Sequence, residues 1–244
     1  NSGVSAAIAM RERRVFHGRR HGRRLRSSRA RQLETGLAAL SVDLSNSPID
    51  PHRLFEASEN GGGGGPVKET WLEIGFGAGE HLIAQAQAHP DIGFIGCEPF
   101  MNGVARLMSD IDARDVRNVR VHADDARDLL DGLPAASITR CFILFPDPWP
   151  KSRHNNRRIV SPENLDSLAR VLSDGAELRL ASDHMEYIRW MLFHILRHGA
   201  FEWACRGPAD WRSRPADASP TRYEEKALAR GDSCVYLRFK RCGR

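Results

Sequence analysis

The chain has 244 residues, of which 41% are hydrophobic, so it is long enough to bury the core of one sizeable domain. Its 36 lysine and arginine residues outnumber its 31 aspartate and glutamate residues, which gives a net charge of +5. No run of eighteen apolar residues is present, and residues 4–10 are too short for a secretory signal. The composition therefore excludes a membrane-spanning helix and predicts a soluble protein that is not secreted.

Cysteine and histidine usage argues against a disulfide framework and against a metal site. The five cysteines form no CxxC pair, and four of them lie in strand-like stretches, which is typical of reduced thiols in a cytoplasmic protein. His194 and His198 have the i, i+4 spacing of a helical metal pair, but no HExxH motif accompanies them. We therefore expect no metal, and a cytoplasmic location.

The first 66 residues are predicted to be an appendage to the folded domain. Between positions 11 and 31 the chain has ten arginines and a single acid, Glu12. Such a block repels itself, so we do not expect it to pack. It is either an arm that holds a nucleic-acid backbone or a flexible, solvated tail. Short apolar groupings follow in residues 32–57, and SENGGGGGP at 58–66 predicts a flexible linker before a domain at 67–244.

Strand-like and helix-like segments alternate from residue 67 onward. The strand candidates are residues 71–74, 92–98, 119–122, 137–145 and 176–182. The helix candidates between and after them are residues 80–88, 101–112, 126–131, 162–172 and 184–198. This alternation predicts an α/β fold with a doubly wound, mostly parallel sheet whose active site lies at the carboxyl ends of the strands.

Two further strand candidates, residues 201–206 and 233–240, end the chain. The polar stretch 207–232 between them has no periodic segment of helix length, so we expect the two strands to form an antiparallel hairpin. With that hairpin the sheet has seven strands and a Rossmann-like arrangement.

A glycine-rich turn follows the first strand and has the pattern Glu73-x-Gly75-x-Gly77-x-Gly79. Glycines allow a sharp turn and a close approach of the backbone to a ligand. A dinucleotide fingerprint requires its third glycine where this chain has Glu80, and a carboxylate in the first turn of a helix disfavours a pyrophosphate. It is tolerated beside a sulfonium and an ammonium group. Taken alone, the turn is a weak signal, and a tight strand-to-helix connection is the plain alternative.

Acidic residues follow the second and third strands. Glu98 ends the second strand, where a carboxylate can accept hydrogen bonds from both hydroxyls of a ribose, although a solvated acid at a strand end is the plain alternative. Asp124 and Asp125 follow the third strand, where one acid is suited to the amino group of adenine and one to capping the next helix. Together with the glycine turn, these acids resemble the cofactor site of S-adenosylmethionine-dependent methyltransferases.

The stretch that follows the fourth strand, residues 145–158, is the most specific in the chain. Asp147 lies between two prolines, which fix the backbone and hold the carboxylate rigidly at the edge of the sheet. Trp149 adds a flat face. Five basic or imidazole side chains come next, namely Lys151, Arg153, His154, Arg157 and Arg158. This combination suits phosphates together with a base, whereas a charge run alone usually indicates a solvated face.

The sequence FPDPWPKSRHNNRR resembles the signature of bacterial tRNA (guanine-N7-)-methyltransferases. LEIGFGAGEHL at the first strand, GCEPF at the second, ASDHMEY after the fifth, and the motif from Thr221 to Glu224 add to the resemblance, which covers residues 67–241. The glycine linker and the arginine block depart from the family's core pattern. Residues 17–26 are similar to the tails of some members.

The resemblance implies a cofactor, a substrate and a role for each matching residue. The cofactor is S-adenosylmethionine, with S-adenosylhomocysteine as product, and the substrate is tRNA, methylated at guanine 46 of the variable loop. The residues implied to contact the cofactor are Glu73, the turn glycines Gly75, Gly77 and Gly79, Glu98, Asp125 and Asp147. Asp125 is preferred to Asp124 because it aligns with the family's Asp-Ala pair. Asp147 is also implied to be catalytic. The residues implied to hold the substrate are Lys151, Asp183, Thr221, Arg222, Tyr223 and Glu224, together with residues 153–158 on the RNA.

The chemistry of guanine N7 refines the role expected of Asp147. N7 carries a lone pair and no proton, so no general base is needed, and positioning supplies most of the acceleration. A carboxylate can orient the base and stabilise the positive charge that develops on it. Asp183 or Glu224 is expected to accept hydrogen bonds from guanine N1–H and the 2-amino group.

Three alternatives stay open at this stage. The first is a methyltransferase with another RNA or amino-group target, although such enzymes usually have Asn-Pro-Pro before an aromatic residue. The second is a dinucleotide oxidoreductase, which Glu80 argues against. The third is a non-enzymatic RNA-binding module, which the retained cofactor residues argue against. The sequence does not decide between monomer and homodimer.

Overall fold

The computed structural model describes residues 16–56 and 66–244. The start of the arginine-rich segment, up to residue 15, and almost all of the predicted glycine linker therefore lie outside the described residues. The division of the chain at residue 66 stays a prediction.

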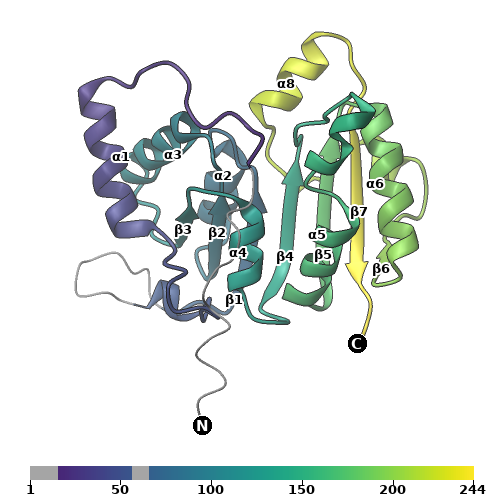
Figure 1. Ribbon diagram of the computed structural model, residues 1–244, viewed down its shortest axis with the longest axis horizontal. Coiled ribbons are helices and arrows are strands. Elements are labelled where there is room, and N and C mark those ends of the chain that lie inside the picture. The colour runs from purple at the N-terminus through teal and green to yellow at the C-terminus, as the bar shows by residue number, and fades with distance from the viewer. Residues whose placement is uncertain (1–15, 57–65) are drawn as a thin grey trace.

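A seven-stranded sheet forms the centre of the molecule (Figure 1), with the strand order β3-β2-β1-β4-β5-β7-β6. Its strands are β1 (Glu69–Ile74), β2 (Ile92–Cys97), β3 (Val119–His122), β4 (Ile138–Leu144), β5 (Leu172–Ser182), β6 (Phe201–Trp203) and β7 (Val235–Arg241). Strands β1 to β5 are parallel, and β7 is antiparallel to both β5 and β6. The predicted doubly wound sheet with a terminal antiparallel hairpin is confirmed.

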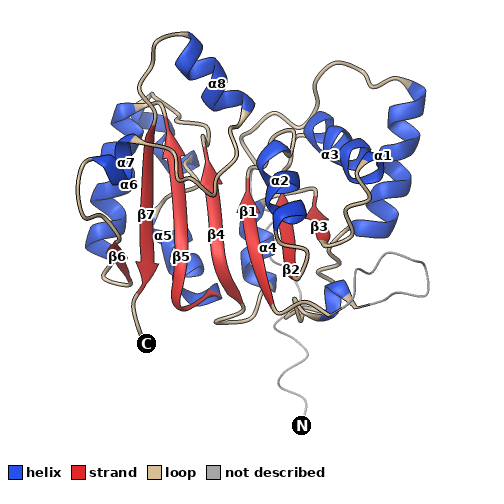
Figure 2. Cartoon of the chain, turned by 180° about the vertical axis from the view of Figure 1, so that it is seen from behind, coloured by secondary structure: helices blue, strands red, loops and turns tan. Residues whose placement is uncertain are grey.

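Helices cover both faces of this sheet. They are α2 (Glu80–Ala88), α3 (Met101–Ala113), α4 (Ala126–Gly132), α5 (Pro162–Val171) and α6 (Met185–His198). Helices α4, α5 and α6 lie on the face nearer the viewer in Figure 1, and Figure 2 shows α2 and α3 on the other face. Because both faces are covered, β1 and β2 are buried along almost their whole length, and two apolar layers form the core.

The N-terminal part of the described chain packs against the domain, which differs from what its arginine content led us to expect. Residues Ser27–Leu40 form helix α1, and Leu33, Leu37 and Leu40 pack against the apolar layer of α2 and α3. Helices α1 and α3 are so close at Gly36 that a Cβ added there would lie 2.5 Å from the sulfur of Met108 on α3. A 3₁₀ turn, η1 (Arg53–Phe55), then buries Phe55 completely.

The polar stretch before the last strand also contains helices that the sequence pattern did not predict. They are α7 (Ala209–Arg212) and α8 (Arg222–Ala229). A 3₁₀ helix, η2 (Ser152–Arg157), follows β4 within the basic run. None of the described helices is long and apolar enough to cross a membrane.

The order of the strands places a crevice at the carboxyl ends of the parallel strands, between β1 and β4. The chain winds outward from β1 through β2 and β3 to one side, and from β4 to β5 on the other, so the direction reverses between β1 and β4. Loops that follow two such strands diverge, and in doubly wound folds ligands bind in the gap between them.

Candidate active site

A pocket of about 610 Å³ lies at the carboxyl ends of the parallel strands. This volume is typical of sites for small molecules and cofactors. Segments that follow β1, β2, β3 and β4 line it, together with α8 and the chain before α1. The lining includes the following residues named from the sequence: Gly75, Gly77, Glu98, Asp125, Asp147, Trp149, Arg157, Arg158 and Tyr223.

The glycine turn after β1 forms one wall of the pocket. Gly75 and Gly77 have left-handed φ angles of 77° and 59°, a conformation that side chains with a Cβ rarely adopt. Helix α3 approaches the turn so closely that a Cβ on Gly103 would lie 2.0 Å from the carbonyl oxygen of Gly77. Gly79, with φ 86°, begins α2 against Leu107 and does not line the pocket, so its role here is to shape the turn.

Glu98 lies directly after β2 and fixes the turn from the other side. Its carboxylate is buried and accepts hydrogen bonds from the backbone N–H groups of Gly77 and Phe100, each at 2.8 Å. Burial raises the pKa of Glu98 above its usual value, although the two N–H groups oppose that shift.

Glu73, in β1, is held away from the pocket. Its side chain is buried, and its carboxylate forms a 2.7 Å hydrogen-bonded pair with Nδ1 of His81 on α2. Glu73 does not line the pocket. In this structure it therefore supports the start of the glycine turn from within the core.

The two acids after β3 have different environments. Asp125 lines the pocket and also caps α4, because its carboxylate accepts a hydrogen bond from the backbone N–H of Arg127 at 2.9 Å. It also pairs with the Arg127 guanidinium. Asp124 does not line the pocket and pairs with Arg20. This pair and the Asp125 backbone N–H lower the pKa of Asp124, although burial opposes the shift.

The loop after β4 presents Asp147 to the pocket in a constrained backbone. Phe145 and Trp149, on either side, have positive φ angles of 52° and 43°, which are uncommon for residues other than glycine. The Asp147 side chain is open to the pocket, and none of the described residues pairs with its carboxylate. Desolvation by the surrounding walls raises the pKa of Asp147.

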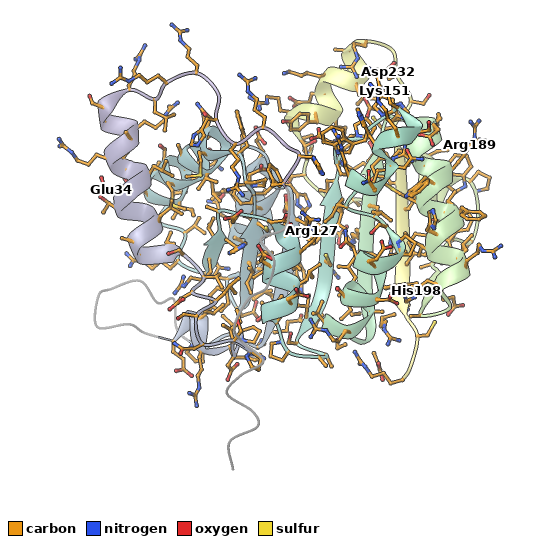
Figure 3. All side chains as sticks on the ribbon, in the orientation of Figure 1. Glu34, Arg127, Lys151, Arg189, His198 and Asp232 are labelled. Atoms are coloured by element: carbon orange, nitrogen blue, oxygen red, sulfur yellow. The ribbon has the colours of Figure 1, made fainter. Side chains whose placement is uncertain are left out.

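The basic residues after Asp147 are grouped around Trp149. The Arg157 guanidinium lies over the Trp149 ring at 5.1 Å, and the His154 ring meets the same indole edge-on at 5.8 Å. Desolvation, followed by the neighbouring cations, lowers the pKa of His154. Lys151 and Arg153 are exposed, and Figure 3 shows Lys151 at the edge of the molecule near α8.

Arg158 does not fit the prediction that it contacts RNA phosphates. Only 1% of the residue is exposed, and its guanidinium forms an ion pair with Glu186 on α6. It also donates hydrogen bonds to the carbonyl oxygens of Pro148 and Trp149 at 2.9 and 3.3 Å. A guanidinium enclosed in this way has no face left for a phosphate.

The motif from Thr221 to Glu224 forms the start of α8. Thr221 and Glu224 make a reciprocal capping box, and Glu224 also accepts hydrogen bonds from the Tyr236 hydroxyl at 2.5 Å and from Arg214 at 3.1 Å. Both side chains are buried, so the prediction that they contact the substrate directly is not supported. Tyr223 lies between them in sequence, is 47% exposed and lines the pocket.

Two other predicted substrate residues lie outside the pocket. Asp183 follows β5 and pairs with Arg230 at 2.9 Å, so neither it nor Glu224 stands in the pocket as an acceptor for guanine. Arg222 is exposed, with its guanidinium 5.7 Å from the centre of the Tyr223 ring.

The segment before α1 contributes a wall that sequence reasoning missed. Residues 16–19 line the pocket, and the segment is tied to the domain at several points. Arg20 pairs with Asp124 through its side chain and accepts a hydrogen bond from Met101 N–H at 2.8 Å through its carbonyl. Gly22 N–H donates to the Asn102 side chain at 2.7 Å. The similarity of residues 17–26 to family tails was the signal that pointed here.

The histidine pair considered as metal ligands makes other contacts. His194 packs against Trp190, with ring centres 4.1 Å apart, and His198 pairs with Asp166 at 3.0 Å. Within residues 16–56 and 66–244, no group of three or more His, Cys, Asp or Glu side chains is arranged to hold a metal ion.

Comparisons with known proteins agree with the fold and identify the family. A family model described as "Putative methyltransferase" matches residues 68–237. Among solved structures, the 16S rRNA methyltransferase KamB has a TM-score of 0.55 and covers 72% of this chain, with 89% of its own length matched. At 16% sequence identity that likeness concerns the fold alone.

Closely similar sequences cover nearly the whole chain. The tRNA (guanine-N(7)-)-methyltransferase of Rhodospirillum rubrum is 50% identical over 230 residues, which is 93% of this chain and 87% of the relative. The protein of the same name from Roseobacter denitrificans is 48% identical over 235 residues, covering 93% and 96% of the two chains. The chain therefore belongs to the tRNA (guanine-N(7)-)-methyltransferases, a family of S-adenosylmethionine-dependent transferases.

Proposed function

We propose that this protein transfers the methyl group of S-adenosylmethionine to N7 of a guanine in tRNA, at position 46 of the variable loop. The observation that carries the proposal is the placement of Asp147. Its carboxylate is unpaired among the described residues and faces the pocket from a constrained loop, next to Trp149 and Arg157. The curated relatives named above support the choice of tRNA and of N7.

The lining of the pocket fits S-adenosylmethionine. Glu98 stands where a carboxylate can accept from ribose hydroxyls, and Asp125 stands where one can accept from an adenine amino group. Gly75 and Gly77 leave the backbone open to the methionine part of the cofactor, because neither has a side chain in the way. When bound, this cofactor supplies an electrophilic methyl group on a sulfonium.

The residues around Trp149 suit the RNA. Lys151, Arg153 and Arg157 carry cationic groups for phosphates, and the indole offers a face on which an unstacked base can rest. Arg157 both lines the pocket and lies over the indole of Trp149. It can therefore hold the phosphate of the target nucleotide close to the base that reacts. His154 completes this group.

Asp147 acts on the base without removing a proton. Guanine N7 already has a free lone pair, so the main task of the site is to align N7 with the methyl group. The purine becomes cationic as the new bond forms, and a carboxylate beside it stabilises that charge. The constrained loop keeps Asp147 in place before the substrate arrives, which avoids a reorganisation cost during the reaction.

The test is incubation of the protein with radiolabelled S-adenosylmethionine and bulk tRNA, followed by nucleoside analysis. We expect label in 7-methylguanosine, and none when guanine 46 of a transcript is replaced by adenine. Label in another nucleoside, or in protein, would show a different methyl acceptor.

Single substitutions separate the two roles in the site. Asp147→Ala is expected to lower kcat to background with tRNA affinity nearly unchanged, whereas Arg157→Ala is expected mainly to raise the Kd for tRNA. Turnover in Asp147→Ala at the wild-type rate contradicts the assignment. A cytoplasmic location goes with this proposal, because tRNA is the substrate and all five cysteines are free thiols.

A further inference from the structure

Arg158 is the largest fully buried side chain among the described residues, and the transfer chemistry leaves it without a task. It stands eleven positions after Asp147, at the end of η2, and its guanidinium points back under the loop that presents that acid. A buried guanidinium is costly unless all its donors are engaged. The partners of Arg158 therefore indicate what it does.

Four contacts engage the guanidinium on its edges. Nε donates to the Pro148 carbonyl at 2.9 Å, and Nη2 donates to the Trp149 carbonyl at 3.3 Å. Nη1 and Nη2 also reach the two carboxylate oxygens of Glu186 at 3.2 and 2.5 Å. This two-pronged geometry needs the planar fork of an arginine, and a lysine ammonium cannot reproduce it.

Aromatic rings of α6 enclose the same group. The guanidinium carbon lies 4.9 Å from the centre of the Tyr187 ring and 4.8 Å from that of Trp190. Glu186, Tyr187 and Trp190 all belong to α6, a fourteen-residue helix packed against the sheet. Arg158 thus joins the loop of Asp147 to a rigid element.

The loop after β4 needs hydrogen-bond donors from outside, because it has few backbone N–H groups of its own. Pro146, Pro148 and Pro150 have no N–H group, so the loop cannot form the backbone hydrogen bonds of an ordinary turn. Positive φ angles at Phe145 and Trp149 add strain, which persists only when surrounding contacts hold it. Arg158 supplies two of those contacts, to the carbonyl oxygens of Pro148 and Trp149.

We propose that Arg158 is a positioning residue that fixes Asp147 and Trp149 through the carbonyl groups of Pro148 and Trp149, with Glu186 as its anchor. The proposal rests on the proposed function for the role of Asp147, but the loop's order can be measured without any substrate. It departs from the interpretation of this basic run as a uniform set of phosphate ligands.

The main variant is Arg158→Lys, which keeps the charge and removes the fork. We expect kcat to fall at least about tenfold while the KM for tRNA changes less than about threefold, because misplaced catalytic groups affect turnover rather than RNA affinity. A rise in KM with kcat unchanged would overturn the proposal and favour a phosphate contact. Arg157→Ala provides the comparison, since it should raise KM.

Arg170→Lys is a control for the loss of a guanidinium that bridges two carbonyl groups, at an exposed residue. Its guanidinium also bridges two carbonyl oxygens, those of Leu133 at 2.6 Å and Leu130 at 2.5 Å, but it lies at the amino end of β4, opposite the pocket. We expect its kcat to stay within about twofold of wild type at a temperature where all variants are folded. An equal loss of kcat in both variants would mean a general effect on stability and would overturn the positioning role.

Glu186→Gln weakens the anchor and leaves Arg158 in place. We expect an intermediate loss of kcat, and a double variant whose loss is smaller than the product of the two single losses, because both act through one contact. Independent, multiplicative losses would contradict the anchor.

Amide hydrogen exchange of residues 149–158 separates this proposal from the assigned reaction. In Arg158→Lys, exchange there should be at least about tenfold faster than in wild type and in Arg170→Lys. Unchanged exchange overturns the positioning role even if the enzyme is active. A wild-type protein that makes no 7-methylguanosine, yet shows the expected exchange, overturns the proposed function and leaves the positioning role standing.

Discussion

Individual carboxylates in this pocket differ in what surrounds them, and those surroundings set their tasks. Glu98 is buried under two backbone N–H groups, Asp125 pairs with Arg127, and Asp147 faces the pocket with no partner among the described residues. A group with satisfied neighbours holds its geometry, while an unpaired one is free to meet a charge that arises in the reaction. This contrast favours Asp147 as the group next to the methylated base.

If Glu98 holds the ribose as proposed, its raised pKa should make cofactor affinity depend on pH. Burial raises its pKa above the usual 4.5, so on acidification Glu98 binds a proton before an exposed glutamate does. A protonated acid accepts fewer hydrogen bonds from the ribose. We expect the calorimetric Kd for S-adenosylhomocysteine to rise as pH falls through the raised pKa, by up to about tenfold per pH unit.

Glu98→Gln is the control for that measurement. It should bind the cofactor product more weakly than wild type at neutral pH, with a Kd that no longer changes over the same range. A wild-type Kd that is constant down to pH 4.5, the usual pKa of glutamate, contradicts the assignment of Glu98 to the ribose.

The sequence predicted the position of a residue well where its immediate neighbours fix it. It failed where the contacts come from distant parts of the chain. The proline-flanked Asp147 was expected at the edge of the sheet and lies there. Arg157 and Arg158 are neighbours of the same type, yet the guanidinium of Arg157 lies over Trp149 and that of Arg158 is buried against the rings of α6. Nothing in the basic run distinguishes them, because the rings that enclose Arg158 come from about thirty residues further along the chain.

Helix α8 contributes to the pocket through its first turn, where Tyr223 lines the wall. Its capping box holds the first turn, and that turn carries Tyr223, whose ring lies against the glycine turn, 3.1 Å from where a Cβ on Gly77 would be. The order of the cap therefore controls one wall of the pocket.

Thr221→Ala should loosen this wall. Loss of an N-cap hydroxyl costs about 1 kcal/mol of stability, and we expect the KM for S-adenosylmethionine to rise several-fold as Tyr223 becomes mobile. Thermal unfolding and steady-state kinetics measure the two effects, and Thr221→Ser, which keeps the hydroxyl, should restore both. If both variants have the wild-type KM, the cap does not order the pocket.

The elements that the sequence did not reveal were hidden by composition. Leu33, Leu37 and Leu40 repeat at helical spacing in α1, but the arginines before them favoured a tail that does not pack. In α8 the Thr-x-x-Glu pattern of a capping box was present and was interpreted only as a substrate motif. The alternating strands and helices of the sheet were predictable because their apolar periodicity is strong and continuous.

At the scale of the whole molecule, charge is distributed unevenly. Arg23, Arg24 and Arg26 are exposed in the segment before α1, which Figure 1 shows along the upper edge of the sheet, the edge that holds the pocket. Arg189 and Arg197 are exposed on α6, and Figure 3 shows Arg189 at the side of the molecule. The first group belongs to the segment whose residues 16–19 line the pocket.

We expect Arg23→Gln combined with Arg24→Gln to raise the KM for tRNA at low salt. The slope of log KM against log salt concentration should also fall, by about 0.7 to 0.9 for each phosphate that the protein no longer neutralises. The double variant Arg189→Gln with Arg197→Gln removes the same charge from α6. It should leave the KM for tRNA and the salt slope unchanged. Equal effects in the two double variants would mean that only net charge matters and that the segment does not hold RNA.

Two segments far apart in the sequence wall the pocket, since residues 16–19 and Tyr223 line it and lie more than two hundred positions apart. During synthesis the first of these walls leaves the ribosome well before the second. A nascent chain that ends before α8 has the glycine turn and the loop of Asp147 but an incomplete site. We therefore expect full affinity for the methyl donor only once α8 has been made, and chains truncated before α8 are not expected to compete for it.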